Sequence, residues 1–111
     1  MFRTERIKKK IDYLEIMKNI SEKKLKGYFS VTEKALKVIK IAAPKSTHLH
    51  EAAKDFLDMA KRYFKDAKHF EKKGDYVTAF AALNYAHGWL DAGARIGLFD
   101  VNHNSRLFTV D

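Results

Sequence analysis

Two residues, Gly74 and Asp75, separate two long stretches in which apolar residues recur every three or four positions. These stretches cover about 47–73 and 76–96, and their spacing is typical of amphipathic α-helices. Glycine readily adopts the left-handed conformation that follows a helix end, and aspartate caps the start of a helix. Because so short a connection leaves no room for a crossover, the two helices must run antiparallel. The sequence therefore predicts a helical hairpin as the centre of the fold.

The sequence before this hairpin predicts one or two further helices. Ser21 is a suitable N-cap, and an apolar stripe from Leu25 to Ile39 keeps its helical phase past Gly27. We expect Pro44 to stop this helix, because proline cannot continue a helix and disfavours helical backbone at the residue before it. Ser46 or Thr47 can then cap the first helix of the hairpin.

An earlier amphipathic helix is expected from Thr4 to about Asn19, with a stripe formed by Ile7, Ile11 and Leu14. After Gly97 the sequence loses helical period. The predicted fold class is all-α, an antiparallel bundle of three to four helices. We divide the chain into a basic amphipathic N-terminal extension (1–20), a helical bundle domain (21–101) and an unassigned tail (102–111).

Length and composition are those of one globular domain. The chain has 111 residues, of which 46% are hydrophobic, and it contains no cysteine. Disulfides, thiolate nucleophiles and cysteine-based metal sites are excluded, and a reducing compartment is the natural setting. The sequence shows neither a signal-peptide core nor a run of about 20 apolar residues. We therefore expect a cytoplasmic protein without a membrane partner.

Positive charge is concentrated in the N-terminal part of the chain. Residues 1–45 hold 13 Lys or Arg against five Asp or Glu, whereas residues 46–111 hold nine of each kind. Such a segment could bind RNA or DNA through counterion release. The alternative is an ordinary solvated helix face. The candidate nucleic-acid-binding residues are Lys8, Lys9, Lys10, Lys23 and Lys26.

The string YAHGWLDAGARIGLFD in the second hairpin helix, preceded by YFKDAKHFEKKGDYVTAF, resembles a family of short archaeal proteins, domain of unknown function 357. The resemblance covers about residues 21–101. It implies a helical bundle from an archaeal cytoplasm, and it implies no activity because the family has none assigned.

A looser resemblance connects the chain to HEPN-type helical domains, in which a helix, a GDY-like turn and an alanine-rich helix form the core. Some of these domains are ribonucleases with an Arg a few residues before a His. Arg95 and His103 are more widely spaced here, so the chain departs from that signature.

A polar stripe follows each hairpin helix at helical spacing. Antiparallel geometry predicts a ladder of charge pairs, with Arg62 beside His87 and Asp91. One interpretation of this ladder is structural: the charge pairs close one side of the hairpin and fix the register of its two helices. The other is functional: the ladder lines a polar cleft in which His87 acts as acid or base, or in which arginines bind a phosphate. The stripe consists of Asp55, Asp58, Arg62, Asp66, Asn84, His87, Asp91 and Arg95.

No catalytic residue, metal ligand or cofactor is assigned from the sequence. Neither hairpin helix carries a serine for a Ser–His–Asp arrangement, and the Asp66–His69 spacing lacks the glutamates of a di-iron bundle. Gly88, Gly93 and Gly97 predict close approach of another helix, or, for Gly97, helix termination.

We expect a non-enzymatic interaction module that self-associates as a dimer through the stripe of Ile7, Ile11 and Leu14. The alternatives are an RNA-binding or RNA-processing domain and a small nucleotide-handling enzyme that uses His87, Asp91 and Arg95.

Overall fold

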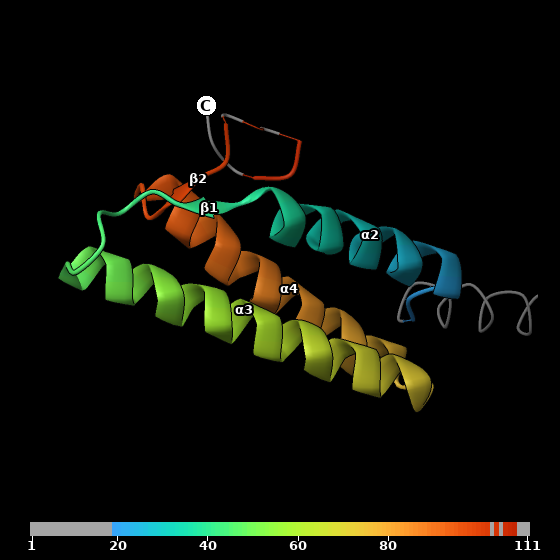
Figure 1. The fold of residues 1–111 in the computed structure, drawn as a ribbon. Coiled ribbons are helices and arrows are strands. Elements are labelled where there is room, and N and C mark those ends of the chain that lie inside the picture. Colours follow the sequence, from blue (N-terminus) through green and yellow to red (C-terminus); the bar gives the residue numbers. More distant parts are fainter. Residues whose placement is uncertain (1–18, 103, 105, 109–111) are drawn as a thin grey trace, which may run out of the picture.

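In the part of the chain that the structure describes, the fold is a bundle of three helices joined at one end by a small two-stranded sheet. The computed structural model describes residues 19–102, 104 and 106–108. Within these residues the elements are α2 (Glu22–Val38), β1 (Lys40–Ile41), α3 (His48–Lys72), α4 (Tyr76–Arg95) and β2 (Phe99–Asp100), shown in Figure 1. The all-α bundle predicted from the sequence is confirmed. The helix predicted between Thr4 and Asn19 lies almost wholly outside the described residues.

The hairpin of α3 and α4 forms as predicted, with the expected residues at its turn. Gly74 has φ +79°, and the Asp75 side chain accepts a hydrogen bond from the backbone N–H of Thr78 at 3.1 Å. Thr47 caps α3 by accepting from the N–H of His50. These contacts satisfy N–H groups that have no partner inside the helix, which is why the helices begin there.

Small residues bring the two hairpin helices close together. The residues that α3 buries completely are alanines seven positions apart: Ala53, Ala60 and Ala67. Beside them, the rings of Phe56 and Trp89 contact each other with centroids 4.9 Å apart. Two turns of a helix bring a residue back to the same face, so the alanines form a flat strip on which α4 packs.

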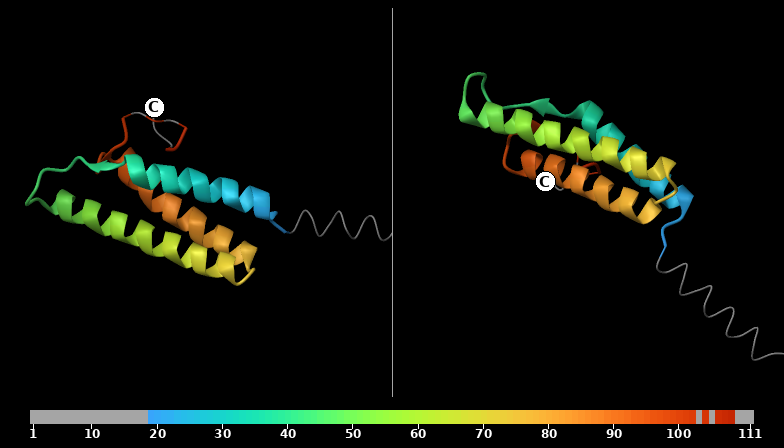
Figure 2. Two further views of the ribbon diagram at one scale, coloured as in Figure 1. Left: turned by 45° about the vertical axis from the view of Figure 1, so that its right-hand side comes forward. Right: turned by 90° about the horizontal axis from the view of Figure 1, so that it is seen from below.

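Helix α2 covers the hairpin and runs parallel to α4, as the views in Figure 2 show. Its N-cap is Ser21, and the helix continues through Gly27 without a break, both as predicted. It buries Leu25, Phe29, Thr32 and Ala35.

The C-terminal end of α2 differs from the prediction. The helix stops at Val38, six residues before Pro44, because Ile39 has extended backbone with ψ 145°. Strand β1 then pairs antiparallel with β2, with Ile41 opposite Phe99, and the N–H of Ala42 donates to the carbonyl of Leu98 at 2.9 Å. The prediction that Pro44 ends the helix is wrong, because pairing with a distant strand provides hydrogen bonds that compete with helix continuation.

The residues after α4 complete the core. Gly97, with φ +83°, ends the helix as one of the sequence readings proposed. The chain then turns back, and its apolar residues join Leu90 and the alanines of α3 in the larger of two core clusters. The buried residues that follow Gly97 are Leu98, Phe99, Val101 and Phe108. Part of the tail that the sequence left unassigned is therefore core.

Some apolar residues of the predicted stripes remain on the surface. Leu49, Val77 and Ile96 are more than half exposed. Within the described part of the chain, no helix is both long and apolar enough to cross a membrane.

Candidate functional site

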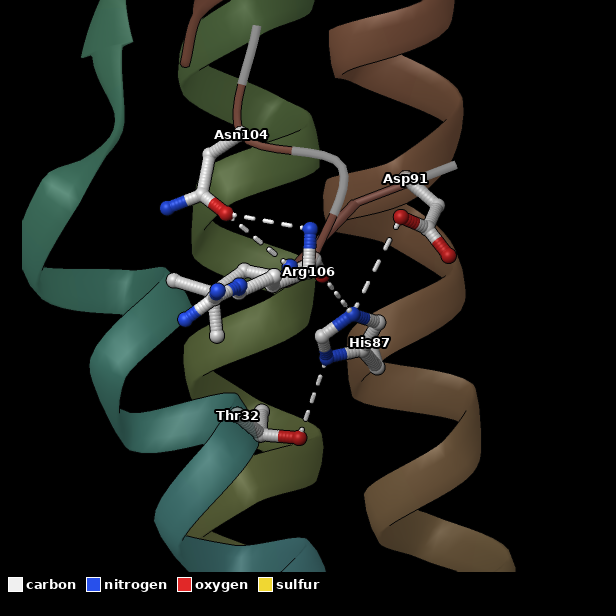
Figure 3. Close-up of polar contacts among 6 residues, drawn as sticks. Thr32, His87, Asp91, Asn104 and Arg106 are labelled. Carbon is white, nitrogen blue, oxygen red and sulfur yellow. Dashed lines mark hydrogen bonds and ion pairs between the residues drawn. The ribbon is translucent and has the colours of Figure 1, made fainter. Parts of the chain in front are cut away.

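His87 joins three segments that are distant in the sequence. Its Nδ1 lies 3.1 Å from the hydroxyl of Thr32 on α2, and its Nε2 lies 2.6 Å from the carbonyl oxygen of Leu107 after β2. Figure 3 shows His87 on α4 facing Thr32 of α2, with Asp91 one turn further along α4. The Asp91 carboxylate lies 3.8 Å from Nε2, and both side chains are about one-fifth exposed, at 19% and 24%.

The partners determine how the imidazole is protonated. A carbonyl oxygen only accepts hydrogen bonds, so Nε2 carries a proton and donates to Leu107. In the neutral ring Nδ1 then accepts from the Thr32 hydroxyl, and in the charged ring it donates to the same oxygen. Both ring nitrogens are thus engaged in either state.

A tight turn holds the Leu107 carbonyl against His87. The side-chain Oδ1 of Asn104 accepts hydrogen bonds from the backbone N–H groups of Arg106 and Leu107, at 3.1 and 3.2 Å. The backbone carbonyl of Asn104 accepts a hydrogen bond from the N–H of Phe108. The Phe108 ring is buried and stacks on the imidazole, with 6.0 Å between centroids. His87 therefore fastens the end of the chain to α2 and α4.

The sequence missed most of this arrangement. Thr32 falls within the apolar stripe predicted from Leu25 to Ile39, and a lone hydroxyl in such a stripe is itself a sign of a buried hydrogen-bond partner. Asn104, two residues before Arg106, fits the Asx-type turn that asparagine favours. Neither signal indicates that His87 is the common partner, because the contacts join residues 55 and 20 positions apart.

The predicted charge ladder along the hairpin is wrong. Arg62 binds Asp58 on its own helix, with Nε and Oδ2 2.9 Å apart, and both side chains are more than half exposed. His87 instead faces α2 and the tail. Alanines and aromatic rings form the interface between α3 and α4. Because this face of α4 packs on α3, the polar stripe of α4 points away from α3.

The other members of the predicted stripe lie on the surface. Asp55 and Asp66 are exposed on α3, and Asn84 and Arg95 are exposed on α4. Of the predicted stripe, the structure thus brings His87 and Asp91 together on α4, with Asn84 beside them in a groove, and Asp58 and Arg62 together on the surface of α3.

That groove runs between α2 and α4 and has a volume of about 370 Å³. Its exposed apolar side chains are Tyr28 and Val31, and the Tyr28 ring leans on Phe80 with 4.8 Å between centroids. At Gly88 an added Cβ would meet no atom within 4 Å, so the backbone of α4 is open there. We name this the α2–α4 groove; its residues are Tyr28, Val31, Thr32, Leu83, Asn84, His87, Gly88 and Asp91.

Two lysines of α2 line a hollow that shares Tyr28 and Val31 with the groove. Lys23 and Lys24 line an adjoining apolar hollow with Gly27, Tyr28 and Val31. Nζ of Lys26 lies 3.0 Å from Oε1 of Glu22. The hydrogen bond with the Glu22 carboxylate, together with the negative charge of that carboxylate, raises the pKa of Lys26. Lys8, Lys9 and Lys10, the other candidate nucleic-acid-binding residues, lie outside the described residues.

The described residues contain no group of three or more His, Cys, Asp or Glu side chains that could hold a metal ion.

The comparisons with known proteins identify one family. The sequence model of one family, described as "Protein of unknown function (DUF357)", matches residues 27–99 of the chain. This range begins within α2 and ends at the first residue of β2. No curated protein and no solved structure matches the chain.

Proposed function

We propose that this chain, which belongs to the DUF357 family, is a cytoplasmic, non-enzymatic helical module that associates with a second copy of itself through the α2–α4 groove. The observation that carries the proposal is the groove, where an apolar ridge of Tyr28 and Val31 lies open beside an uncovered stretch of α4 at Gly88. Apolar surface of this kind gains free energy when another helix covers it.

The contacts of His87 support a non-enzymatic role. A general base needs a nitrogen lone pair that can reach the substrate. Here Nε2 is occupied by Leu107 and Nδ1 by Thr32, so proton transfer at His87 would first break a contact that holds the fold together. A nucleotide-handling enzyme using His87, Asp91 and Arg95 is therefore the less favoured reading.

Sedimentation equilibrium tests self-association directly. We expect the 12.9 kDa chain to form a dimer at micromolar concentration. Val31→Glu places a charge in the groove and should weaken the dimer by about tenfold or more, corresponding to about 1.4 kcal/mol. Val77→Glu is the matched control, because Val77 is 56% exposed and lies outside the groove. A monomer at high micromolar concentration, or equal effects of both variants, would contradict the proposal.

RNA binding is the second candidate, and the charge of α2 favours it. Lys23, Lys24 and Lys34 are exposed and form no ion pair within the part of the chain that the structure describes. Next to Lys23 and Lys24, the exposed Tyr28 ring could stack on a base.

Fluorescence anisotropy with a labelled single-stranded RNA separates this candidate from the first. An RNA-binding function requires affinity that falls steeply with salt and is lost in Lys23→Gln/Lys24→Gln. Lys61→Gln/Lys65→Gln on the exposed face of α3 removes the same charge elsewhere and serves as the control. Absence of binding at low salt eliminates RNA.

A further inference from the structure

We infer that the face of the α3–α4 hairpin that points away from α2 is a second self-association surface, on which two copies pack their hairpins into a four-helix bundle. We name it the hairpin face; its large side chains are Leu49, Phe56, Tyr63, Tyr85, Trp89 and Ile96. This surface is separate from the α2–α4 groove, so the inference goes beyond the self-association proposed above and can fail independently of it.

The contacts of α4 show which way the hairpin face points. His87 contacts Thr32 of α2. Tyr85 and Trp89 are two positions before and after His87, which places them about 160° around the helix from it. They therefore lie on the side of α4 that faces away from α2. The ring of Tyr63 contacts that of Tyr85, with 4.5 Å between centroids, so α3 contributes to the same face.

A row of aromatic rings occupies the middle of the hairpin face. The rings of Phe56 and Trp89 have centroids 4.9 Å apart. The ring of Tyr85 lies 6.3 Å from that of Trp89 and continues the row to Tyr63. Although the rings contact one another, Tyr85 is still 55% exposed. The outer side of the row is therefore available to a partner.

The helical repeat extends this row to the end of the hairpin. Leu49 lies seven residues before Phe56, and Ile96 lies seven residues after Trp89. Seven residues are about two turns, which return a side chain to the same side of a helix. Because α3 and α4 run antiparallel, both steps lead to the same level of the hairpin. Leu49 and Ile96 are 60% and 66% exposed, so the apolar surface continues there.

The charge of the hairpin face excludes a polyanion as its partner. At the positions that share this side, spaced three or four apart over 49–63 and 78–96, the sequence has no charged residue. The exposed carboxylates of Asp55 and Asp66, four residues before and seven after Met59, border the face on α3. Binding to RNA or DNA needs lysines or arginines at the surface, so this face requires an apolar, uncharged partner.

A second copy of the hairpin matches the face in size. The 20 residues of α4 give a length of about 30 Å, and two packed helices give a width of about 20 Å. Two copies would then cover about 600 Å² each, or about 1,200 Å² together, which is the lower limit for a stable interface. A single helix, about 10 Å across, would leave half of the width uncovered.

Side-chain size determines which helices pack together. On this face α3 carries the large side chains Met59 and Tyr63, whereas Ala81 and Ala92 are exposed on α4. Large side chains pack closely against small ones, so α3 of each copy lies antiparallel on α4 of the other. This arrangement has a twofold axis parallel to the helices, and residues of one level therefore meet.

Sedimentation equilibrium of Val31→Glu tests the hairpin face without the groove. An interface near the lower size limit is weak, so we expect this variant to pair at hundreds of micromolar, above the range of the groove dimer. Adding Tyr85→Glu should weaken the pairing about tenfold or more, because it places a charge in the apolar face. Adding Val38→Glu is the matched control, since Val38 is an exposed apolar residue on α2.

The outcomes separate this inference from the groove proposal. Val31→Glu that remains a monomer overturns the inference and leaves the groove dimer standing. Pairing of Val31→Glu that Tyr85→Glu does not weaken contradicts both. Wild type and Val31→Glu that pair equally, with Tyr85→Glu abolishing the pairing of both, support the hairpin face and contradict the groove.

Engineered disulfides test the orientation in the Val31→Glu background, and the chain contains no cysteine that would interfere. Ala52 on α3 and Ala92 on α4 lie at about the level of the Phe56–Trp89 contact. Ala52→Cys and Ala92→Cys proteins, mixed and mildly oxidised, should therefore yield a covalent dimer that contains one of each. Ala52→Cys mixed with Lys65→Cys, exposed on another side of α3, is the control and should not. A protein that pairs but forms no disulfide between positions 52 and 92 overturns the inference.

Discussion

Gly93 is the position where a single methyl group should have the largest effect on stability. A Cβ added there would overlap the Phe99 ring, with Cδ2 at 2.5 Å and Cζ at 3.2 Å, whereas real Cβ atoms stay beyond 3.0 Å. Phe99 is 3% exposed and belongs to β2, so its ring cannot move into solvent. Gly93 therefore makes room for a strand of its own chain, where the sequence predicted the approach of another helix.

The magnitude follows from two opposing terms. Replacing an interior helix glycine by alanine gains about 1 kcal/mol through lower conformational entropy in the unfolded chain. Overpacking a buried site costs about 1 to 3 kcal/mol, and an overlap with two ring atoms belongs at the upper end. We expect Gly93→Ala to lose about 2 kcal/mol. Gly88→Ala, where no atom lies within 4 Å, should gain up to about 1 kcal/mol.

Urea denaturation, monitored by circular dichroism, measures the difference in the free energy of unfolding between the two variants. Protein concentration is held equal, because the proposed dimerisation would stabilise the folded state. The two variants should differ by about 3 kcal/mol, the sum of the two effects. Phe99→Leu removes ring atoms, and its destabilisation should be smaller in the Gly93→Ala background than in the wild type. Equal midpoints for Gly88→Ala and Gly93→Ala would refute the reasoning.

Three further outcomes are expected. His87→Ala leaves the buried Thr32 hydroxyl without its partner and should cost about 2 kcal/mol in urea denaturation; a loss below about 0.5 kcal/mol would show that the junction does not stabilise the fold. Arg62→Ala should change the free energy of unfolding by less than about 1 kcal/mol, since its pair with Asp58 is exposed, and a larger loss would restore the predicted ladder. Hydrogen bonds from the side chain and backbone of Thr78 lower the pKa of Asp75, so its carboxylate stabilises the fold above its ordinary pKa and loses that effect as pH falls through the lowered value. The melting temperature of Asp75→Ala should accordingly lie below that of the wild type at pH 7 and approach it as the pH falls through the lowered pKa of Asp75. A difference that does not vary with pH would contradict this cause.

Local signals were sufficient for the hairpin. Thr47, Gly74 and Asp75 act on the backbone within three residues of themselves, and the apolar repeats of α3 and α4 extend over several turns. Such short-range preferences do not depend on the rest of the fold. Ser21 and the unbroken phase through Gly27 predicted α2 for the same reason.

The candidate site depended on long-range packing. Periodicity placed His87 and Asp91 on one polar stripe of α4, but it could not show which neighbour that stripe faces. The alanine strip of α3 and the ring contacts of Phe56 and Trp89 set the rotation of α4 and turn the stripe toward α2.

The sequence by itself determined the three described helices, their capping residues and the hairpin, because these follow from interactions within a few positions of the chain. Only the tertiary structure decided that α2 stops at Val38, that Phe99 occupies the space above Gly93, and that His87 joins Thr32 to Leu107. Each of these features joins segments far apart in the chain. Their free energies arise only when distant segments meet, so no local pattern encodes them.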